Sequence, residues 1–352
     1  MSAAAVPNTH FAPALLDWYD RHGRKQLPWQ TPRTPYRVWL SEIMLQQTQV
    51  ATVIGYFRRF VDTLPDLPAL AAAPVDQVLG LWSGLGYYSR ARNLHKAAKL
   101  CVERHGGELP HDFDALAALP GIGRSTAGAI LAQAFGQRRA ILDGNVKRVL
   151  SRYHGVDGWP GATATARTLW QHAEDNTPDA RVADYTQAIM DLGATLCVRS
   201  RPRCGVCPVS GGCIALRERR TAELPARKPA KTSPTRATCM LILRDDAGRV
   251  LLQRRPSTGV WAELWSLPEA SDVDAAEHTA RRAGARIDHA RTLDSFVHVF
   301  SHYRLAVTPL LARAVPLPRA ADGDGLRWYT ADEYTQLGLP APVRRLLQSL
   351  PD

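Results

Sequence analysis

No stretch of this 352-residue chain is long enough and free enough of charge to span a lipid bilayer. Residues 1–25 also lack the basic start and unbroken apolar block of a secretory signal peptide, because Pro, Asp and Arg recur along them. Hydrophobic residues still make up 45% of the chain, which is enough to build proper cores. We therefore expect a globular cytoplasmic protein with no membrane partner.

Acidic residues are in deficit. The chain has 33 Asp and Glu against 44 Lys and Arg, which gives a formal net charge of +11. A surplus of this size favours a polyanionic partner, nucleic acid first and a membrane surface second, although charge alone does not separate the two.

Cysteine is scarce, and most of it is gathered in one short segment. Cys197, Cys204, Cys207 and Cys213 follow one another as C-x6-C-x2-C-x5-C. In a reducing compartment such a group suits a metal site better than a disulfide framework. Four soft thiolate ligands select zinc or an iron–sulfur cluster, and the spacing by itself does not choose between them.

The chain is too long for one typical domain, and its composition changes after Arg220. Residues 223–234 are basic, rich in Pro and aperiodic, which indicates a linker. Apolar residues repeat at helical spacing before this segment, whereas strand-like alternation follows it. We expect a mainly α N-terminal domain over residues 1–222, a linker over 223–236 and an α/β domain over 237–352.

Two glycines, Gly121 and Gly123, mark a turn between two helical patterns within residues 113–135. Glycine permits left-handed backbone and very close approach of a ligand, so bare amides at the start of the second helix can bind a phosphate. Gly-x-Gly alone is more typical of an ordinary helix connection than of a phosphate site.

Two acidic residues, Glu42 and Asp143, have unusual surroundings. Glu42 lies beside an apolar helical stripe, and Gln46 and Gln49 follow it at i+4 and i+7 where a solvated face would usually carry Lys or Arg. Apolar surroundings raise the pKa of a carboxyl and so allow Glu42 to act as a general acid. The alternative is a surface Glu at a helix start that interacts with the helix dipole. Asp143 precedes Gly-Asn at another helix start, where an Asp caps the helix or takes part in chemistry.

Several of these segments, in the same order, resemble one enzyme family. LPGIGRSTAGAI followed by LDGNVKRVL is similar to the helix-hairpin-helix and catalytic Asp of the endonuclease III superfamily, and its wording is that of the MutY-type adenine DNA glycosylases. SEIMLQQT around Glu42 is similar to a second segment of that family. The resemblance covers nearly the whole chain. It implies a base-excision repair enzyme that hydrolyses the N-glycosidic bond of adenine mispaired with 8-oxoguanine or guanine in double-stranded DNA.

The resemblance also implies a role for each motif. Glu42 would protonate the flipped adenine, Asp143 would stabilise the sugar cation, and the four cysteines would bind a 4Fe-4S cluster in a loop over residues 197–213. The remaining implied contacts are Gln47 and Tyr87 inserted into the duplex, Gly121, Gly123, Ser125 and Lys147 on the DNA, Trp29 and Gln187 at the flipped base, and Phe300, Ser301 and His302 at 8-oxoguanine. We expect a monomer associated with the nucleoid of a bacterial-type cell.

Trp29 and Gln187 also have plain structural explanations. On general grounds Trp29 belongs to a core rather than to a ligand contact. Gln187 is as readily a polar residue of a helix as a residue that reads the base.

Ser125 separates two reactions within the superfamily. In lyase members a Lys occupies this position and attacks the sugar carbon, whereas a hydroxyl cannot form the imine that strand cleavage needs. We predict a monofunctional glycosylase, with Lys147 as a weak substitute. The alternatives are an endonuclease III-like glycosylase/lyase and a nonenzymatic DNA-binding protein, which would keep the hairpin but would not need Glu42.

The C-terminal part resembles the Nudix-like domain of the same family, including the segment GVWAELW at residues 259–265. True Nudix hydrolases carry a helix with several Glu residues for a divalent metal. The corresponding residues 275–284 contain one, Glu277. We therefore expect this domain to recognise the mispair rather than to hydrolyse a nucleotide.

Overall fold

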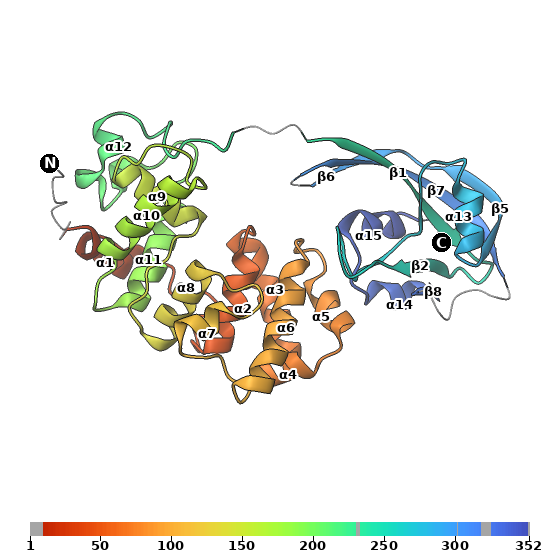
Figure 1. The fold of residues 1–352 in the computed structure, drawn as a ribbon, viewed down its shortest axis with the longest axis horizontal. Coiled ribbons are helices and arrows are strands. Elements are labelled where there is room, and N and C mark those ends of the chain that lie inside the picture. Colours follow the sequence, from red (N-terminus) through yellow and green to blue (C-terminus); the bar gives the residue numbers. More distant parts are fainter. Residues whose placement is uncertain (1–9, 230–232, 301, 318–324, 351–352) are drawn as a thin grey trace. The chain divides into compact units, whose positions relative to one another are not determined.

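The computed structural model describes residues 10–229, 233–300, 302–317 and 325–350 (Figure 1). The chain forms two compact units. The first comprises Met1–Ala72 and Asn93–Pro229, and the second comprises Ala73–Arg92 and Ala230–Asp352. The chain therefore leaves the first unit near residue 73, returns to it at residue 93, and leaves it again after residue 229.

The first unit is helical (Figure 1). Its helices are α1 (Phe11–His22), α2 (Pro35–Leu45), α3 (Val50–Thr63), α4 (Leu67–Ala72), α6 (Ser89–Arg104, which begins in the second unit), α7 (Phe113–Ala117), α8 (Arg124–Phe135), α9 (Gly144–Tyr153), α10 (Thr163–Asn176), α11 (Val182–Thr195), the 3-10 turns η1 (Cys204–Val206) and η2 (Ser210–Gly212), and α12 (Ile214–Arg217). Local sequence explains several helix ends. Thr34 caps α2 by accepting the Arg37 N–H, Pro35 is the first residue of that helix, and Gly136 ends α8 in the left-handed conformation at φ 66°.

Helices α1, α9 and α11 share one apolar core. Phe11 and Leu15 of α1 are buried in it with Leu150 of α9 and with Ile189 and Leu192 of α11. Burial of such side chains is the main stabilising contribution. It holds α1 against α9, the helix that begins after Asp143, and against α11.

Two glycines allow close approaches around the segment that carries Asp143. A Cβ on Gly128, in the middle of α8, would lie 2.5 Å from the carbonyl oxygen of Ala140. A Cβ on Gly193 of α11 would lie 2.7 Å from the Cβ of Asn145. Residues 140–145 are therefore held tightly between α8 and α11.

The second unit is built on a mixed eight-stranded sheet (Figure 1). Its strands are β1 (Thr235–Arg244), β2 (Val250–Arg254), β3 (Trp265–Ser266), β4 (Glu269–Ala270), β5 (Ala285–Thr292), β6 (Phe296–Val299), β7 (Arg304–Pro316) and β8 (Leu326–Tyr329), and its further helices are α5 (Val75–Trp82), α13 (Ala276–Arg282), α14 (Ala331–Thr335) and α15 (Ala341–Gln348). The main path runs β3-β2-β1-β7-β5, with β4 paired to β1, β6 to β7 and β8 to β2. Strands β1 and β7 are parallel, and Thr235 pairs with Arg304.

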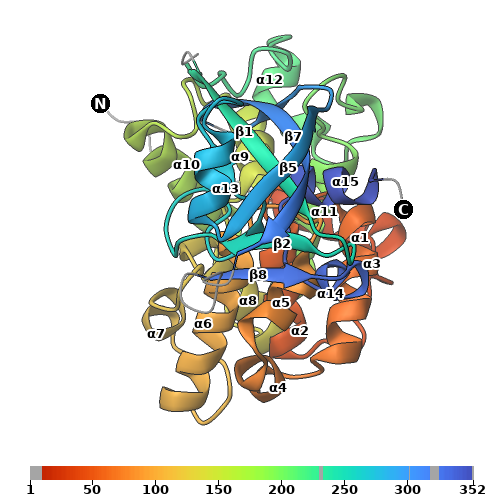
Figure 2. The ribbon, with the colours of Figure 1, turned by 90° about the vertical axis from the view of Figure 1, so that its right-hand side faces the viewer.

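Both faces of this sheet are covered. Alternate residues of β1 point to opposite faces, as the pleat requires. Met240 and Ile242 join a core that includes Val343 of α15, whereas Leu241 and Leu243 join a second core that includes α13. Figure 2 shows α13 lying alongside the crossing strands β1 and β5. The C-terminal part is thus an α/β sandwich, as expected from the sequence.

Residues 73–92 pack into this second unit. The Tyr88 hydroxyl donates a hydrogen bond to the carbonyl oxygen of Leu339 at 2.8 Å, and the Arg344 guanidinium donates to the Ser83 hydroxyl at 2.6 Å. The sequence-based boundaries placed this segment in the helical domain instead. Helical periodicity identifies a buried face, but it does not say which unit covers that face.

Candidate active site

A cavity of about 1060 Å³ lies in the first unit. Its walls come from α2 and the loop after it, from the first turn of α8, from the start of α9 and from α11. Six of the residues predicted for the site line it: Trp29, Glu42, Gln47, Ser125, Asp143 and Gln187. The fold therefore brings together both candidate carboxyls, although 100 residues separate them in sequence.

Glu42 is partly exposed to this cavity, and its Oε1 accepts a hydrogen bond from Nε2 of Gln133 at 3.0 Å. Burial, with a further contribution from the negative charge of Asp143, raises the pKa of Glu42 to about 7. The hydrogen bond from Gln133 opposes this rise. A carboxyl with such a pKa is often protonated at neutral pH, as a general acid must be.

Asp143 is the N-cap of α9, where its Oδ1 accepts the Val146 backbone N–H at 2.7 Å. Burial raises its pKa, whereas the N–H groups of Val146 and Asn145 and the charges of Arg148 and Lys147 act in the opposite direction. A helix N-terminus and two cations favour the ionised form of a carboxyl. The surroundings of the two carboxyls therefore differ. Glu42 accepts a hydrogen bond from a neutral amide, whereas backbone N–H groups and two cations act on Asp143.

Ser125, in the first turn of α8, accepts the Leu142 backbone N–H through its Oγ at 2.9 Å. Leu142 directly precedes Asp143, so this bond anchors the backbone that carries the acid. The hydroxyl thus has a structural partner as well as a place in the cavity wall.

Gln187 is buried, and its Nε2 donates to Oδ1 of Asp191 at 2.8 Å, one turn further along α11. Asp191 also accepts the backbone N–H and the guanidinium of Arg24, at 2.8 Å and 2.6 Å. The sequence analysis missed both Asp191 and Arg24. The i,i+4 spacing of Gln187 and Asp191 was a usable signal, whereas Arg24 lies 167 residues away in sequence.

Trp29 behaves mainly as a core residue. Only 3% of its surface is exposed, and its ring packs edge-on against Phe57 with a centroid distance of 5.4 Å. It nevertheless forms part of the cavity wall.

Two predicted DNA-contacting residues have left-handed backbone. In the first unit Gln47, in the loop after α2, has φ 57°, and in the second unit Tyr87 has φ 49°. Both are exposed, and Tyr87 shows 49% of its surface. Non-glycine residues adopt this conformation at a cost, and they gather at functional sites.

The hairpin glycines are exposed, as phosphate binding would require. Gly121 has φ 81°, and a Cβ there would come within 2.9 Å of Asn93. Gly123 is the N-cap of α8, and a Cβ there would meet nothing within 4 Å, so the space beside this helix start is open. Lys147 lies on the first turn of α9 and is partly buried.

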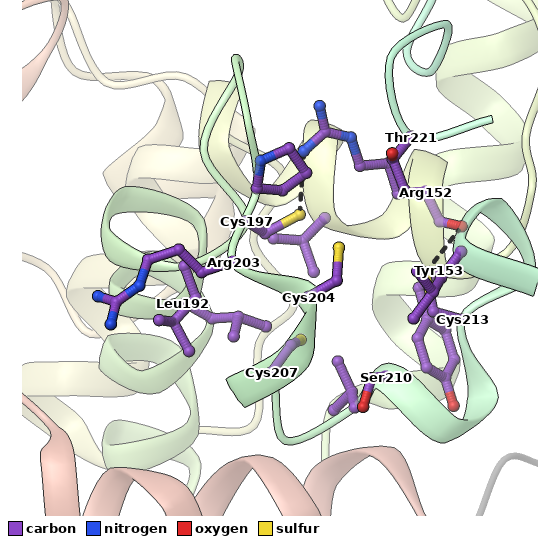
Figure 3. A pocket seen from close by; sticks show the side chains of 15 residues that line it. Arg152, Tyr153, Leu192, Cys197, Arg203, Cys204, Cys207, Ser210, Cys213 and Thr221 are labelled. Carbon is purple, nitrogen blue, oxygen red and sulfur yellow. Dashed lines mark hydrogen bonds between the residues drawn. The ribbon is translucent and has the colours of Figure 1, made fainter. Parts of the chain in front are cut away.

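The four clustered cysteines line one small cavity (Figure 3). All six cysteines are free thiols, and Cys101 and Cys239 are buried elsewhere. Nη1 of Arg152 donates to Sγ of Cys197 at 3.4 Å. Within the described residues no three His, Cys, Asp or Glu converge closely enough for one metal ion. Soft thiolate ligands at one cavity suit zinc or an iron–sulfur cluster.

The residues predicted to read 8-oxoguanine lie in the second unit. The ring of Phe300 stacks on that of Tyr303 with a centroid distance of 4.6 Å, and its centroid lies 5.0 Å from that of Trp261. His302 is exposed. Ser301 lies outside the described residues. In the helix that true Nudix hydrolases use for metal, Glu277 is ion-paired with Arg281 at 2.7 Å.

Comparison with known proteins identifies the family. The chain is 36% identical over 340 residues to the adenine DNA glycosylase of Buchnera aphidicola, covering 96% of this chain and 97% of the relative. It belongs to the adenine DNA glycosylase family. The human adenine DNA glycosylase is 35% identical over 405 residues, covering 97% of this chain and 74% of the human protein.

Two family models divide the chain of this DNA glycosylase. Residues 40–175 match the HhH-GPD superfamily base excision DNA repair protein, and residues 238–349 match the NUDIX domain. The solved structure of a thermostable thymine-DNA glycosylase is 27% identical with a TM-score of 0.54, covering 59% of this chain and 95% of that chain. The predicted fold class and enzyme class are therefore confirmed. None of the described helices has the length and apolar character needed to cross a membrane.

Proposed function

We propose that this adenine DNA glycosylase homologue hydrolyses the N-glycosidic bond of adenine mispaired with 8-oxoguanine or guanine. The observation that carries the proposal is the pair Glu42 and Asp143, which line one cavity with unlike partners. Release of a base from its sugar needs a proton on the leaving base and an anion near the developing oxocarbenium ion. Two carboxyls in unlike environments meet that need.

Glu42 is the general acid in this scheme. It gives its proton to the nitrogen of the five-membered ring of adenine that is not bonded to the sugar, so the electron pair of the C–N bond can leave with the base. Asp143 stays ionised and stabilises the sugar cation until water adds. Because both carboxyls line a cavity inside the protein, adenine must be flipped out of the duplex to reach them.

Gln187 and Trp29 complete the base pocket. Asp191 engages the amide nitrogen of Gln187, which leaves the Oε1 of Gln187 to accept a hydrogen bond from the exocyclic amine of adenine. Trp29 offers an apolar wall for the purine ring.

The duplex is held by contacts that do not read sequence. The bare amides at Gly121 and Gly123 bind a backbone phosphate, and Lys147 adds positive charge. Gln47 of the first unit and Tyr87 of the second unit each insert into the duplex. The net charge of +11 fits such a partner. The enzyme acts as a monomer on double-stranded DNA in a nucleoid.

The enzyme is monofunctional. Ser125 occupies the position of the lyase Lys, and its hydroxyl accepts the Leu142 N–H. A hydroxyl cannot form the imine that strand cleavage needs. The alternative, a glycosylase/lyase of the endonuclease III type, would require Lys147 to supply the amine.

The cysteine-lined cavity suits a 4Fe-4S cluster held by Cys197, Cys204, Cys207 and Cys213. When bound, the cluster cross-links residues 197–213. This loop exposes Arg199, Arg201 and Arg203, so a braced loop would present a fixed cationic surface to DNA.

Phe300, Ser301 and His302 are proposed to read the oxidised guanine. Phe300 is held by the aromatic cluster with Tyr303 and Trp261, and the neighbouring His302 is exposed, so a base could reach its ring.

Single-turnover adenine release from defined duplexes, measured with and without alkali, tests the proposal. We expect adenine release from both mispairs, and strand breaks only after alkali. Glu42→Gln should slow release by at least about 100-fold while mispair binding persists, since general acid catalysis contributes about 10² to 10⁴. Strand cleavage without alkali would support the lyase, and unchanged release by Glu42→Gln would refute the mechanism.

A further inference from the structure

Gln133 is a buried polar residue in an apolar stretch of α8. Only 5% of its surface is exposed, and its neighbours on the helix include the buried Ile130, Leu131 and Ala132. A buried side-chain amide costs free energy unless it finds a hydrogen-bond partner. Its Nε2 finds one in Oε1 of Glu42, 91 residues earlier in the chain, at 3.0 Å.

The other charged groups around Glu42 have different partners. Asp143, at the start of α9, caps that helix. Arg148 of α9 donates to Asn145 Oδ1 and to backbone carbonyls. Arg24 lines the cavity but is paired with Asp191, against α11. Among the described residues, it is the neutral amide of Gln133 that donates a hydrogen bond to the carboxyl of Glu42.

We propose that Gln133 is a positioning residue for base release, whose amide fixes Oε1 of Glu42 and leaves Oε2 to carry the proton to the base. The inference rests on the proposed function. As the proton leaves Oε2, the carboxyl becomes charged, and the Gln133 N–H then donates to an anion. Such a bond is about twice as strong as a neutral one. Gln133 therefore stabilises the transition state more than the ground state.

The same bond makes Glu42 a stronger acid, because a donor to the carboxylate lowers its pKa while burial and Asp143 raise it. The substitution Gln133→Met nearly preserves length and volume but removes both N–H donors. It should raise the pKa of Glu42 and loosen the orientation of its carboxyl.

Single-turnover adenine release is measured between about pH 5 and 9 for the full chain. Release needs protonated Glu42, so the wild-type rate should fall as pH rises through about 7. For Gln133→Met this descending limb should move upward by about one pH unit, and the plateau rate should fall about tenfold, the size of one hydrogen bond to a charged group. Gln137→Met is the matched control, because that partly buried Gln donates an exposed hydrogen bond to the His111 carbonyl, and its profile should coincide with wild type.

Two further measurements keep the outcomes distinct. Melting and binding to the adenine mispair report whether each variant folds. Should Gln133→Met fail to fold, Gln133→Glu retains the size and adds a second carboxyl, which should move the limb upward as well. A lower plateau with an unmoved limb would show a merely structural role and overturn the proposal. Absence of adenine release by the wild-type protein would instead overturn the proposed function.

Discussion

Asp191 is completely buried and holds two parts of the cavity wall at once. It accepts the guanidinium and backbone N–H of Arg24 on one side and the amide of Gln187 on the other. Asp191 is buried and Arg24 is partly exposed, so removing the carboxylate leaves a cation that water compensates only in part, which costs more than losing an exposed pair. The same carboxylate fixes the amide orientation of Gln187, because a carboxylate can only accept.

Asp191→Asn should therefore damage both stability and base selection. We expect the free energy of unfolding to fall by about 3 kcal/mol in denaturant titrations. Adenine release should fall more than duplex binding, because an Asn side chain can also donate and thus lets the Gln187 amide turn over. Asp20→Asn is the control, since its partner Arg181 is exposed, and it should change neither quantity appreciably. Equal effects of the two substitutions would contradict this account.

Local pattern left the candidate site residues open. It allowed Glu42 as a general acid or a surface residue and Asp143 as a cap or a chemical group, and the family resemblance supplied their roles. The structure places both at one cavity and shows Asp143 as an N-cap, so the roles stay predictions. Gln133 and Arg24 were not predictable. Each contacts a residue far away in sequence. The sequence around a Gln in an apolar helix does not show whether a carboxyl lies opposite its amide.

At the level of elements, the contact between α8 and residues 140–143 decides where Asp143 lies. A Cβ on Gly128 would approach the Ala140 carbonyl oxygen to 2.5 Å, a distance that side chains do not tolerate. Backbone cannot yield as a flexible side chain does, so the segment before α9 would have to move. Ser125 bonds to the same segment from one turn earlier in α8.

Gly128→Ala should consequently destabilise the protein by about 1 to 3 kcal/mol, the usual effect of overpacking. Adenine release should slow beyond what the lost stability explains, because Asp143 is displaced. Gly55→Ala is the matched control: Gly55 lies within α3 with nothing within 4 Å, so Ala should stabilise by about 0.5 to 1 kcal/mol. Denaturant unfolding and single-turnover rates are measured for both variants. A change of the same sign in the free energy of unfolding of Gly128→Ala and Gly55→Ala would refute the packing argument.

The strand-like alternation that follows the linker predicts β-strands in the C-terminal part, and the structure has them there, beginning with β1 at Thr235. The parallel pairing of β1 with β7 could not be predicted, because roughly sixty residues separate the two strands and each carries only a local pattern. Which strands pair is decided by the cores on both faces.

At the scale of the whole molecule, the composition change after residue 220 predicts that the chain divides there, and the chain forms two compact units, one of which ends at Pro229. What composition could not show is that residues 73–92 belong with the C-terminal part. Tyr88 donates a hydrogen bond to the Leu339 carbonyl, and Ser83 accepts one from Arg344. The packing of residues 73–92 therefore depends on residues far along the chain. A cut at the linker would therefore not separate two independent units.

Deletion of residues 233–352 should accordingly do more than remove mispair recognition. The segment 73–92 would lose the hydrogen bonds that join Tyr88 to Leu339 and Ser83 to Arg344, so the melting temperature should fall and adenine release should drop on duplexes with 8-oxoguanine and with guanine alike. His302→Ala in the full chain isolates recognition, because His302 is exposed. It should keep the wild-type melting temperature and lose about tenfold in rate only opposite 8-oxoguanine, the effect of one hydrogen bond. A truncated chain as stable as the full one would contradict the packing of residues 73–92, and equal losses on both duplexes in His302→Ala would contradict its role in reading the oxidised base.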